Sequence, residues 1–167
     1  SSVWSPKEDV LGDITTDRTG LRDAELDSVG DIEAGDRGIK QSKIDKAGDV
    51  TSEKAAVQES EIGEIGDIET NNSGIRGSEI GKVGDITAER DGITDTFRED
   101  TASQIGEVGD IDAKNGIRRS QVEKAGDITA ERSAITESEV GETGVLRTEG
   151  RAVIDSTVDS IEAIEAE

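Results

Sequence analysis

The chain has 167 residues, of which 40 are acidic and 19 basic, giving a formal net charge of −21. Binding to nucleic acid needs an excess of lysine and arginine on some face, so this balance argues against that class of partner. Twenty glycines beside a single proline exclude a collagen helix, and no apolar run reaches the length of a membrane span.

From Gly12 onward the chain repeats one pattern about every 18 residues, and a fixed period of this size is typical of repeat architectures. We predict a lead-in over residues 1–11, a rod of eight units over residues 12–161, and an end segment over residues 162–167. Each unit opens with one glycine, and these eight glycines are Gly12, Gly30, Gly48, Gly66, Gly84, Gly109, Gly126 and Gly144.

Small and large residues alternate within each unit, and such period-two alternation directs one set of side chains to one face of a strand. In the unit around Gly84 we expect three inward-facing edges, formed by residues 84–88, residues 78–80 and the pair Gly92 and Ile93. Three short strands per 18 residues suit one coil of a triangular solenoid, and coils stacked about 4.8 Å apart would make a rod of roughly 40 Å. The predicted fold is therefore all-β, an elongated β-solenoid or β-helix in which stacking buries the core.

Two alternatives stay open at this point. Recurrent glycines each cost about 1 kcal/mol inside a helix, which argues against one long helix. A short helix over Ser156 to Glu167 remains an expectation for the C-terminal end. The spacing of Ile80, Val83 and Ile86 is unusual for a simple strand and keeps open an intertwined homotrimeric β fibre.

One unit is longer than the others, with an insertion within residues 94–102 that contains Phe97, the only phenylalanine. Insertions in repeats usually form outward loops, so we expect a surface loop or a segment that docks on a neighbour. The repeat pattern continues to Ile161 without an obvious cap, so we expect another subunit or further chain to cover this end. The chain begins at Ser1 rather than Met, which suggests a processed product or a segment of something longer.

An aspartate follows the opening glycine in seven units. Stacked carboxylates repel each other, so something must offset this repulsion. One interpretation is a row of weak calcium sites, since Ca²⁺ prefers oxygen ligands. The other is that each carboxylate points to solvent or accepts N–H groups of a tight turn. The candidate residues are Asp13, Asp31, Asp49, Asp67, Asp85, Asp110 and Asp127.

A second polar column consists mainly of serines. The chain contains no histidine, so a Ser-His-Asp triad is excluded, and we interpret these serines as small polar residues in a crowded interior position. We predict a non-enzymatic protein with no catalytic residues and no cofactor apart from the calcium just considered. The serine positions are Ser42, Ser60, Ser78, Ser103, Ser120, Ser138 and Ser156, with Ala24 in the first unit.

The string GDITA occurs at Gly84–Ala88 and again at Gly126–Ala130, and each copy is preceded by a serine and, two residues later, an aliphatic residue. This pattern resembles repeats in the stalks of tailed-phage tail fibres and tail-tip host-recognition proteins. That resemblance implies a slender trimeric stalk. The recurring Gly-Asp-Ile-x-Ala is also similar to the bactofilins, which implies a self-polymerising cytoskeletal filament.

We therefore expect a rigid structural rod that self-associates, either as a homotrimer or end to end, and contacts neighbouring structural proteins. A stalk or spacer would be located in a virion or another extracellular appendage, whereas a bactofilin-like polymer would be cytoplasmic. No nucleic acid and no membrane is expected as a partner.

Overall fold

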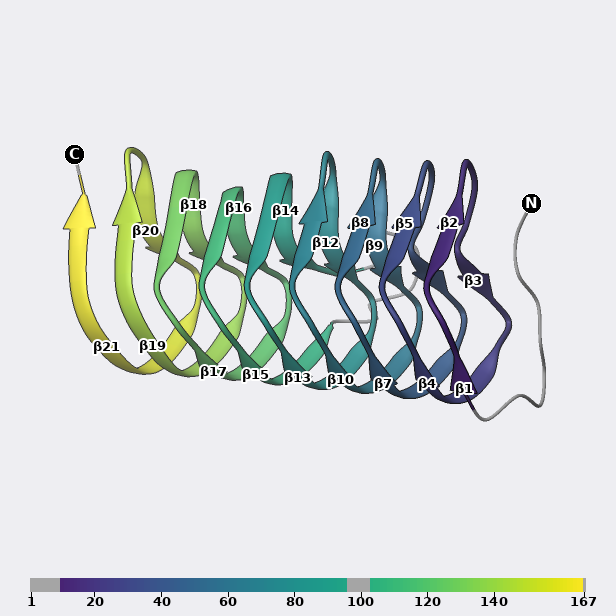
Figure 1. Cartoon of the computed structure of the whole chain (residues 1–167). Coiled ribbons are helices and arrows are strands. Elements are labelled where there is room, and N and C mark those ends of the chain that lie inside the picture. Colours follow the sequence, from purple (N-terminus) through teal and green to yellow (C-terminus); the bar gives the residue numbers. More distant parts are fainter. Residues whose placement is uncertain (1–9, 96–102, 167) are drawn as a thin grey trace.

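A computed structural model of the chain describes residues 10–95 and 103–166. These residues form a parallel β-solenoid, and its coils follow one another along a single axis with the first and the last strand at opposite ends of the rod (Figure 1). The predicted all-β solenoid with repeats of about 18 residues is confirmed. The described residues include no helix with the length and apolarity needed to cross a bilayer.

Each coil consists of three strand segments, which we call the first, second and third faces of the rod. The first face contains β1 (Val10–Leu11), β4 (Glu25–Val29), β7 (Lys43–Ala47), β10 (Glu61–Ile65), β13 (Glu79–Val83), β15 (Gln104–Val108), β17 (Gln121–Ala125) and the first halves of β19 (Glu139–Thr148) and β21 (Thr157–Ala166).

The second face follows a corner at the Gly-Asp pair of each unit. It contains β2 (Ile14–Thr16), β5 (Ile32–Ala34), β8 (Val50–Ser52), β11 (Ile68–Thr70), the first parts of β14 (Ile86–Thr94), β16 (Ile111–Arg118) and β18 (Ile128–Thr136), and the second halves of β19 and β21. The third face contains β3 (Leu21–Arg22), β6 (Ile39–Lys40), β9 (Ala55–Gln58), β12 (Ser73–Arg76), the second parts of β14, β16 and β18, and β20 (Arg151–Ile154).

Equivalent residues of successive coils pair in parallel register. Ile86 lies between Ile68 of the preceding coil and Ile111 of the following coil. The register survives the longer unit, because Ile80 pairs with Ile105 across the insertion. Chain length therefore varies at the corners and turns, while the paired positions keep their partners.

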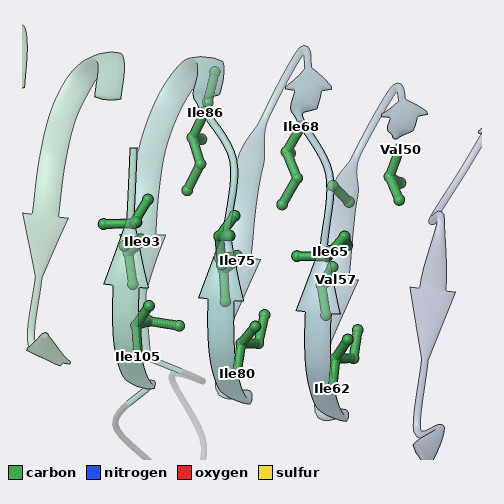
Figure 2. Packing of buried hydrophobic residues seen from close by; sticks show 14 of the residues in the cluster. Val50, Val57, Ile62, Ile65, Ile68, Ile75, Ile80, Ile86, Ile93 and Ile105 are labelled. Carbon is green, nitrogen blue, oxygen red and sulfur yellow. The ribbon is translucent and has the colours of Figure 1, made fainter. Parts of the chain in front are cut away.

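Stacking of equivalent residues produces aliphatic columns that run along the interior of the rod. Figure 2 shows one column through Val50, Ile68 and Ile86 of the second face. A second column of the third face includes Ile75 and Ile93, whose exposed fraction is 0%. The first face supplies a third column through Ile62, Ile80 and Ile105. The apolar core is thus a set of ladders rather than a compact cluster, and every coil depends on its neighbours for burial.

The unusual aliphatic spacing of the first face comes from a break in its pleat. In β13, residues Glu79, Ile80, Lys82 and Val83 pair with the next coil, whereas Gly81 is skipped. The skipped residue lets Ile80 and Val83, three positions apart, both face the interior. Each chain closes its own coils, so the intertwined fibre is not the fold adopted.

The expected C-terminal helix is wrong. Residues Thr157–Ala166 form β21, which pairs with β19 at eight positions, from Glu139↔Thr157 to Thr148↔Ala166. Helix propensity in this segment is overridden because the edge of β19 offers backbone partners and aliphatic residues in register. The strand runs through the corner without a break, since its pairs include Val145↔Ala163.

The corner from the third to the first face uses a left-handed backbone conformation in seven coils. The φ angles there range from 44° to 54° and belong to Asp23, Gln41, Glu59, Gly77, Arg119, Glu137 and Asp155. Only glycine adopts this conformation without steric cost, and other residues lose roughly 1–2 kcal/mol. Six of the seven are not glycine, so contacts around this corner must hold the conformation in place.

We predict that Ile93→Ala lowers the free energy of unfolding by about 2–5 kcal/mol, because it opens a cavity in a fully buried column. Thr87→Ala is the control, since Thr87 lies on the same strand but is exposed, and we expect a change of about 0.5 kcal/mol. Urea unfolding followed by circular dichroism measures both variants. Equal losses in the two variants would contradict the assignment of the inward face.

Candidate functional site

The aspartate that follows each opening glycine binds the backbone of the next coil. Oδ1 of Asp67 accepts a hydrogen bond from the backbone N–H of Asp85 at 2.9 Å. The same bond joins all seven aspartates, with N–O distances of 2.8–2.9 Å, and the last one is donated by Val145 to Asp127. We call this series the aspartate ladder. It runs from one corner to the next along the rod.

The opening glycine is required by this ladder. A Cβ at Gly84 would overlap Oδ1 of Asp67 and would lie 3.0 Å from the carbonyl carbon of Gly66. The other glycines that follow an aspartate-bearing coil meet the same obstacle, namely Gly30, Gly48, Gly66, Gly109, Gly126 and Gly144. A Cβ added at Gly12, by contrast, would have no other atom within 4 Å. Where Val145 replaces the aspartate, the next coil has Glu162 instead of glycine.

Calcium binding by the aspartates stays a prediction. One oxygen of each carboxylate is engaged by backbone N–H, which agrees with the alternative interpretation of turn N–H acceptance. Among residues 10–95 and 103–166, no three acidic side chains are grouped closely enough to hold a metal ion. The ladder thus links successive coils, and its carboxylates follow one another with a spacing of about 4.8 Å.

The serine column forms a second ladder at the left-handed corner. The hydroxyl of Ser60 accepts the backbone N–H of Ser42 at 3.2 Å and donates to the carbonyl of Gln58 at 2.8 Å. Equivalent backbone-to-hydroxyl bonds join Ala24 to Ser42, Ser60 to Ser78, Ser78 to Ser103, Ser120 to Ser138 and Ser138 to Ser156. Most of these hydroxyls are buried, as expected for small polar residues in the interior. Five of these serines directly follow a left-handed residue other than glycine, namely Ser42, Ser60, Ser120, Ser138 and Ser156.

The aspartate ladder ends in an ion-pair cluster. Arg147 lies 2.9 Å from Asp127 of the preceding coil and 3.0 Å from Glu165 of the following coil. The N–H of Val145, together with the guanidinium of Arg147, lowers the pKa of Asp127 below its ordinary range. Arg147 therefore joins the last three coils where the glycine-aspartate pattern stops.

The three faces differ in charge. On the first face, lysine and glutamate alternate from coil to coil and form contacts such as Lys46–Glu64 at 3.8 Å and Lys82–Glu107 at 4.0 Å. The described part of the second face, with its Gly-Asp corners, has Arg147 as its only basic residue. Its acidic residues are Asp13, Asp31, Glu33, Asp49, Asp67, Glu69, Asp85, Asp110, Asp112, Asp127, Glu162 and Glu165.

One column of the third face is partly basic. Arg22, Lys40, Arg76 and Arg118 occupy one column at the ends of its strands. Exposed ion pairs contribute little to stability, so these charge patterns matter more for register and for association with other molecules.

A shallow groove of about 570 Å³ runs along the first face over five coils. It forms where the pleat is broken, because Gly81, Gly106 and Gly141 leave the backbone uncovered. Its rim carries amides and carboxylates, and the amide of Gln121 donates to Glu139 at 2.9 Å. The remaining rim residues are Glu79, Gln104, Glu123, Thr157 and Asp159. The groove offers hydrogen-bonding groups but no histidine or cysteine.

The base of the insertion is fixed to the rod. Thr94 is fully buried, and its carbonyl accepts a hydrogen bond from the hydroxyl of Ser103 at 2.6 Å. Asp95 forms a largely buried ion pair of 3.1 Å with Arg119 of the next coil. Phe97 and the rest of the insertion lie outside the described residues, so its docking stays a prediction.

Sequence reasoning missed three features of these corners. The repeat pattern shows that glycine precedes aspartate but not that the aspartate of one coil excludes a Cβ in the next. It also gives no indication of the left-handed positions, where four residues are acidic and the others are one amide, one arginine and one glycine. Arg147 could have been found as the one basic residue in an otherwise acidic and neutral column.

We predict that Gly84→Ala destabilises the protein by about 1–3 kcal/mol, because the new methyl group overlaps the carboxylate of Asp67. Gly12→Ala is the matched control, since it adds the same atom at the same position of a coil where nothing is in contact. Reduced freedom of the unfolded chain should make that control neutral or stabilising by up to about 1 kcal/mol. Urea unfolding compares the two.

The same pair allows a double-mutant cycle. In an Asp67→Ala background, Gly84→Ala should lower the free energy of unfolding by about 0.5–3 kcal/mol less than it does in the wild type, because the overlapping carboxylate is gone. Additive effects would show that the glycine is required for some reason other than the aspartate ladder.

The lowered pKa of Asp127 gives a prediction about pH. A depressed pKa in the folded state stabilises the protein above the unfolded value of about 3.9, and this contribution is lost as the pH falls through the lowered pKa. Arg147→Ala should raise the pKa of Asp127 toward the ordinary range, leaving the effect of the Val145 N–H. NMR titration of the Asp127 carboxyl carbon measures the shift, with Arg151→Ala on the third face as control. An unchanged pKa of Asp127 in the Arg147→Ala variant would contradict the ion pair between these two residues.

Comparisons with protein-family models, with curated proteins and with solved structures found no match to this chain. The solenoid architecture therefore rests on the structure itself. It is compatible with a repeat stalk, but no relative assigns it to tail fibres or to bactofilins.

Proposed function

We propose that the protein is a non-enzymatic structural rod that serves as a stalk or spacer in a viral tail fibre or a similar extracellular appendage. The observation that carries this proposal is the continuous in-register stack, in which core columns and both ladders pass from coil to coil. A spacer needs length and stiffness, and a stack of this kind supplies both. The acidic surface keeps such a rod soluble and repels nucleic acid.

The charge of the faces supports association of copies side by side. In the parallel homotrimer that we propose, the second face of one copy lies against the third face of the next. The second face is strongly acidic, whereas the third face presents the column with Arg22, Lys40, Arg76 and Arg118. Complementary charges of this kind steer and orient association.

A bactofilin-like filament is the second candidate. It is favoured by the apolar side chains at the ends of the rod, where Val10 is 68% exposed and Ile164 is 52% exposed. Burial of these residues against another copy would release water from apolar surface and favour end-to-end contact.

Solution mass and particle shape separate the candidates. For the stalk we expect a discrete species with three times the mass of one chain and the length of one rod, measured by light scattering and small-angle X-ray scattering. Long particles that grow with concentration would support the filament instead, and a plain monomer would weaken both proposals.

Charge reversal then tests the proposed trimer. Glu33→Lys with Glu69→Lys places two basic residues on the second face and should dissociate the trimer through repulsion from the third face of the next copy. Glu79→Lys with Glu139→Lys makes the same change on the first face and should leave the trimer intact. Equal effects of the two variants would refute this arrangement of faces.

A further inference from the structure

One outward column of the first face carries lysine and glutamate in strict alternation, bounded by a serine on either side. Within the chain, oppositely charged neighbours make only long contacts, 3.8 Å for Lys46–Glu64 and 4.0 Å for Lys82–Glu107, and these four side chains are 57–72% exposed. The charges therefore remain accessible to a partner. We call this series the charge column, and its residues are Ser28, Lys46, Glu64, Lys82, Glu107, Lys124, Glu142 and Ser160.

The charge column is complementary to its own reverse. Read backwards, it has a glutamate wherever the forward order has a lysine, and a serine remains at each end. Two copies that face each other in opposite directions, related by a twofold axis between the coils of Lys82 and Glu107, therefore bring only opposite charges together. The facing pairs, each formed twice, are Lys46 with Glu142, Glu64 with Lys124 and Lys82 with Glu107.

Other arrangements of the two faces lose this match. Parallel copies related by a twofold axis along the charge column place Lys82 opposite Lys82 and Glu107 opposite Glu107. An antiparallel arrangement shifted by one coil also places like charges together, and a shift by two coils keeps only four of the six lysine–glutamate pairs. Like charges that meet across an interface disfavour the wrong arrangement. The charge column thus selects one direction and one register.

A second outward column of the first face matches under the same twofold axis. We call it the corner column, because it follows the left-handed corner of each coil. Each of its carboxylates would lie opposite a lysine, a glutamine amide or a threonine hydroxyl of the other copy, and all of these groups donate hydrogen bonds. The facing residues are Glu25 with Thr157, Lys43 with Glu139, Glu61 with Gln121 and Glu79 with Gln104.

Between these two columns runs the row that forms the groove of the first face. At its centre Gly81 would face Gly106 of the other copy, so the two backbones can approach closely. The larger residues of the row face glycine, apart from the outermost pair, where two aspartates meet at the edge of the face and are screened by solvent. The facing residues outside the centre are Asp45 with Gly141, Glu123 with Gly63 and Asp27 with Asp159.

We propose that the first face is a docking surface for a second copy of this chain, which binds antiparallel about a twofold axis. Such a contact uses the same patch on both copies and closes on itself. A face of about eight coils at about 4.8 Å, with strands of about five residues, covers roughly 600 Å² per copy. This area is at the low end for specific interfaces, so the pairing is reversible and depends on concentration.

The pairing does not depend on the trimer proposed above. In that trimer the second and third faces are in contact and the first face points outward. The first face would therefore bring two trimers together in the same way as two single chains.

Two charge swaps test the pairing at constant net charge. Glu64→Lys with Lys82→Glu exchanges neighbours of the charge column and makes four of the six facing pairs repulsive. Lys82→Glu with Glu107→Lys also exchanges neighbours, but these two positions face each other across the twofold axis, so all six pairs stay attractive. Each swap creates two pairs of like-charged neighbours within the chain, which makes the second swap a matched control for folding.

Chemical crosslinking detects the pairs directly. Glu61→Cys with Gln121→Cys places thiols at facing positions of a chain that otherwise has no cysteine. Within one chain the two positions lie three coils apart, roughly 14 Å, so a thiol reagent that spans about 7 Å joins only different copies. Both links connect the same two chains, so the product is a covalent dimer. Glu61→Cys alone is the control, because position 61 of one copy does not face position 61 of the other.

The swaps are compared in the two-cysteine background at about 0.15 M salt, where repulsion between the net charges of two copies is screened beyond about 8 Å. Circular dichroism confirms that each variant is folded. We expect covalent dimers with the native charges and with the control swap, and pairing at least about tenfold weaker in Glu64→Lys with Lys82→Glu.

Equal dimer yields in the two swaps would overturn the proposal, and so would crosslinked multimers larger than dimers. A chain with native charges that gives no covalent dimer at high concentration would also overturn it. If that chain still formed trimers by light scattering, only the pairing of first faces would be refuted and the proposed stalk would stand.

Discussion

The stack of coils depends on one repeated contact, in which the carboxylate of an aspartate binds the backbone N–H of the next coil at 2.8–2.9 Å. This contact lies at the corner where the first face meets the second, a place where a parallel sheet would otherwise leave an N–H without a partner. The contact also requires glycine immediately before the residue that donates the N–H, because a Cβ at that position would overlap the carboxylate of the preceding coil. The Gly-Asp pair is therefore a unit whose two members act on different neighbours.

The end of the chain shows that this dependence holds in both directions. Where Val145 removes the carboxylate, the following coil no longer needs glycine and has Glu162, and the strand passes through the corner unbroken. Arg147 then connects Asp127 to Glu165 and takes over part of the attachment between coils. A rod of this design can be varied on its surface and in its loops as long as the corner contacts are kept.

The serine ladder and the aliphatic columns stabilise the same stack in different ways. The columns supply most of the favourable free energy, since Ile75, Ile93 and their equivalents are fully removed from water. The buried serines satisfy the backbone at a corner where six residues other than glycine adopt a left-handed conformation. Burial thus favours stacking in general, whereas the two ladders select one register.

The amino-acid sequence by itself determined the period, the all-β class and the inward positions, because alternation around Gly84 and the aliphatic residues at Ile86 and Ile93 follow directly from strand geometry. Only the tertiary structure decided the rest. Thr157–Ala166 is a strand because β19 offers it an edge, although its local preference allowed a helix. The structural roles of Gly84 and Asp85 depend on Asp67 and Asp110, which lie one coil away on either side. Contacts between residues 18 positions apart are absent from any local pattern, and they appear only when the coils are stacked.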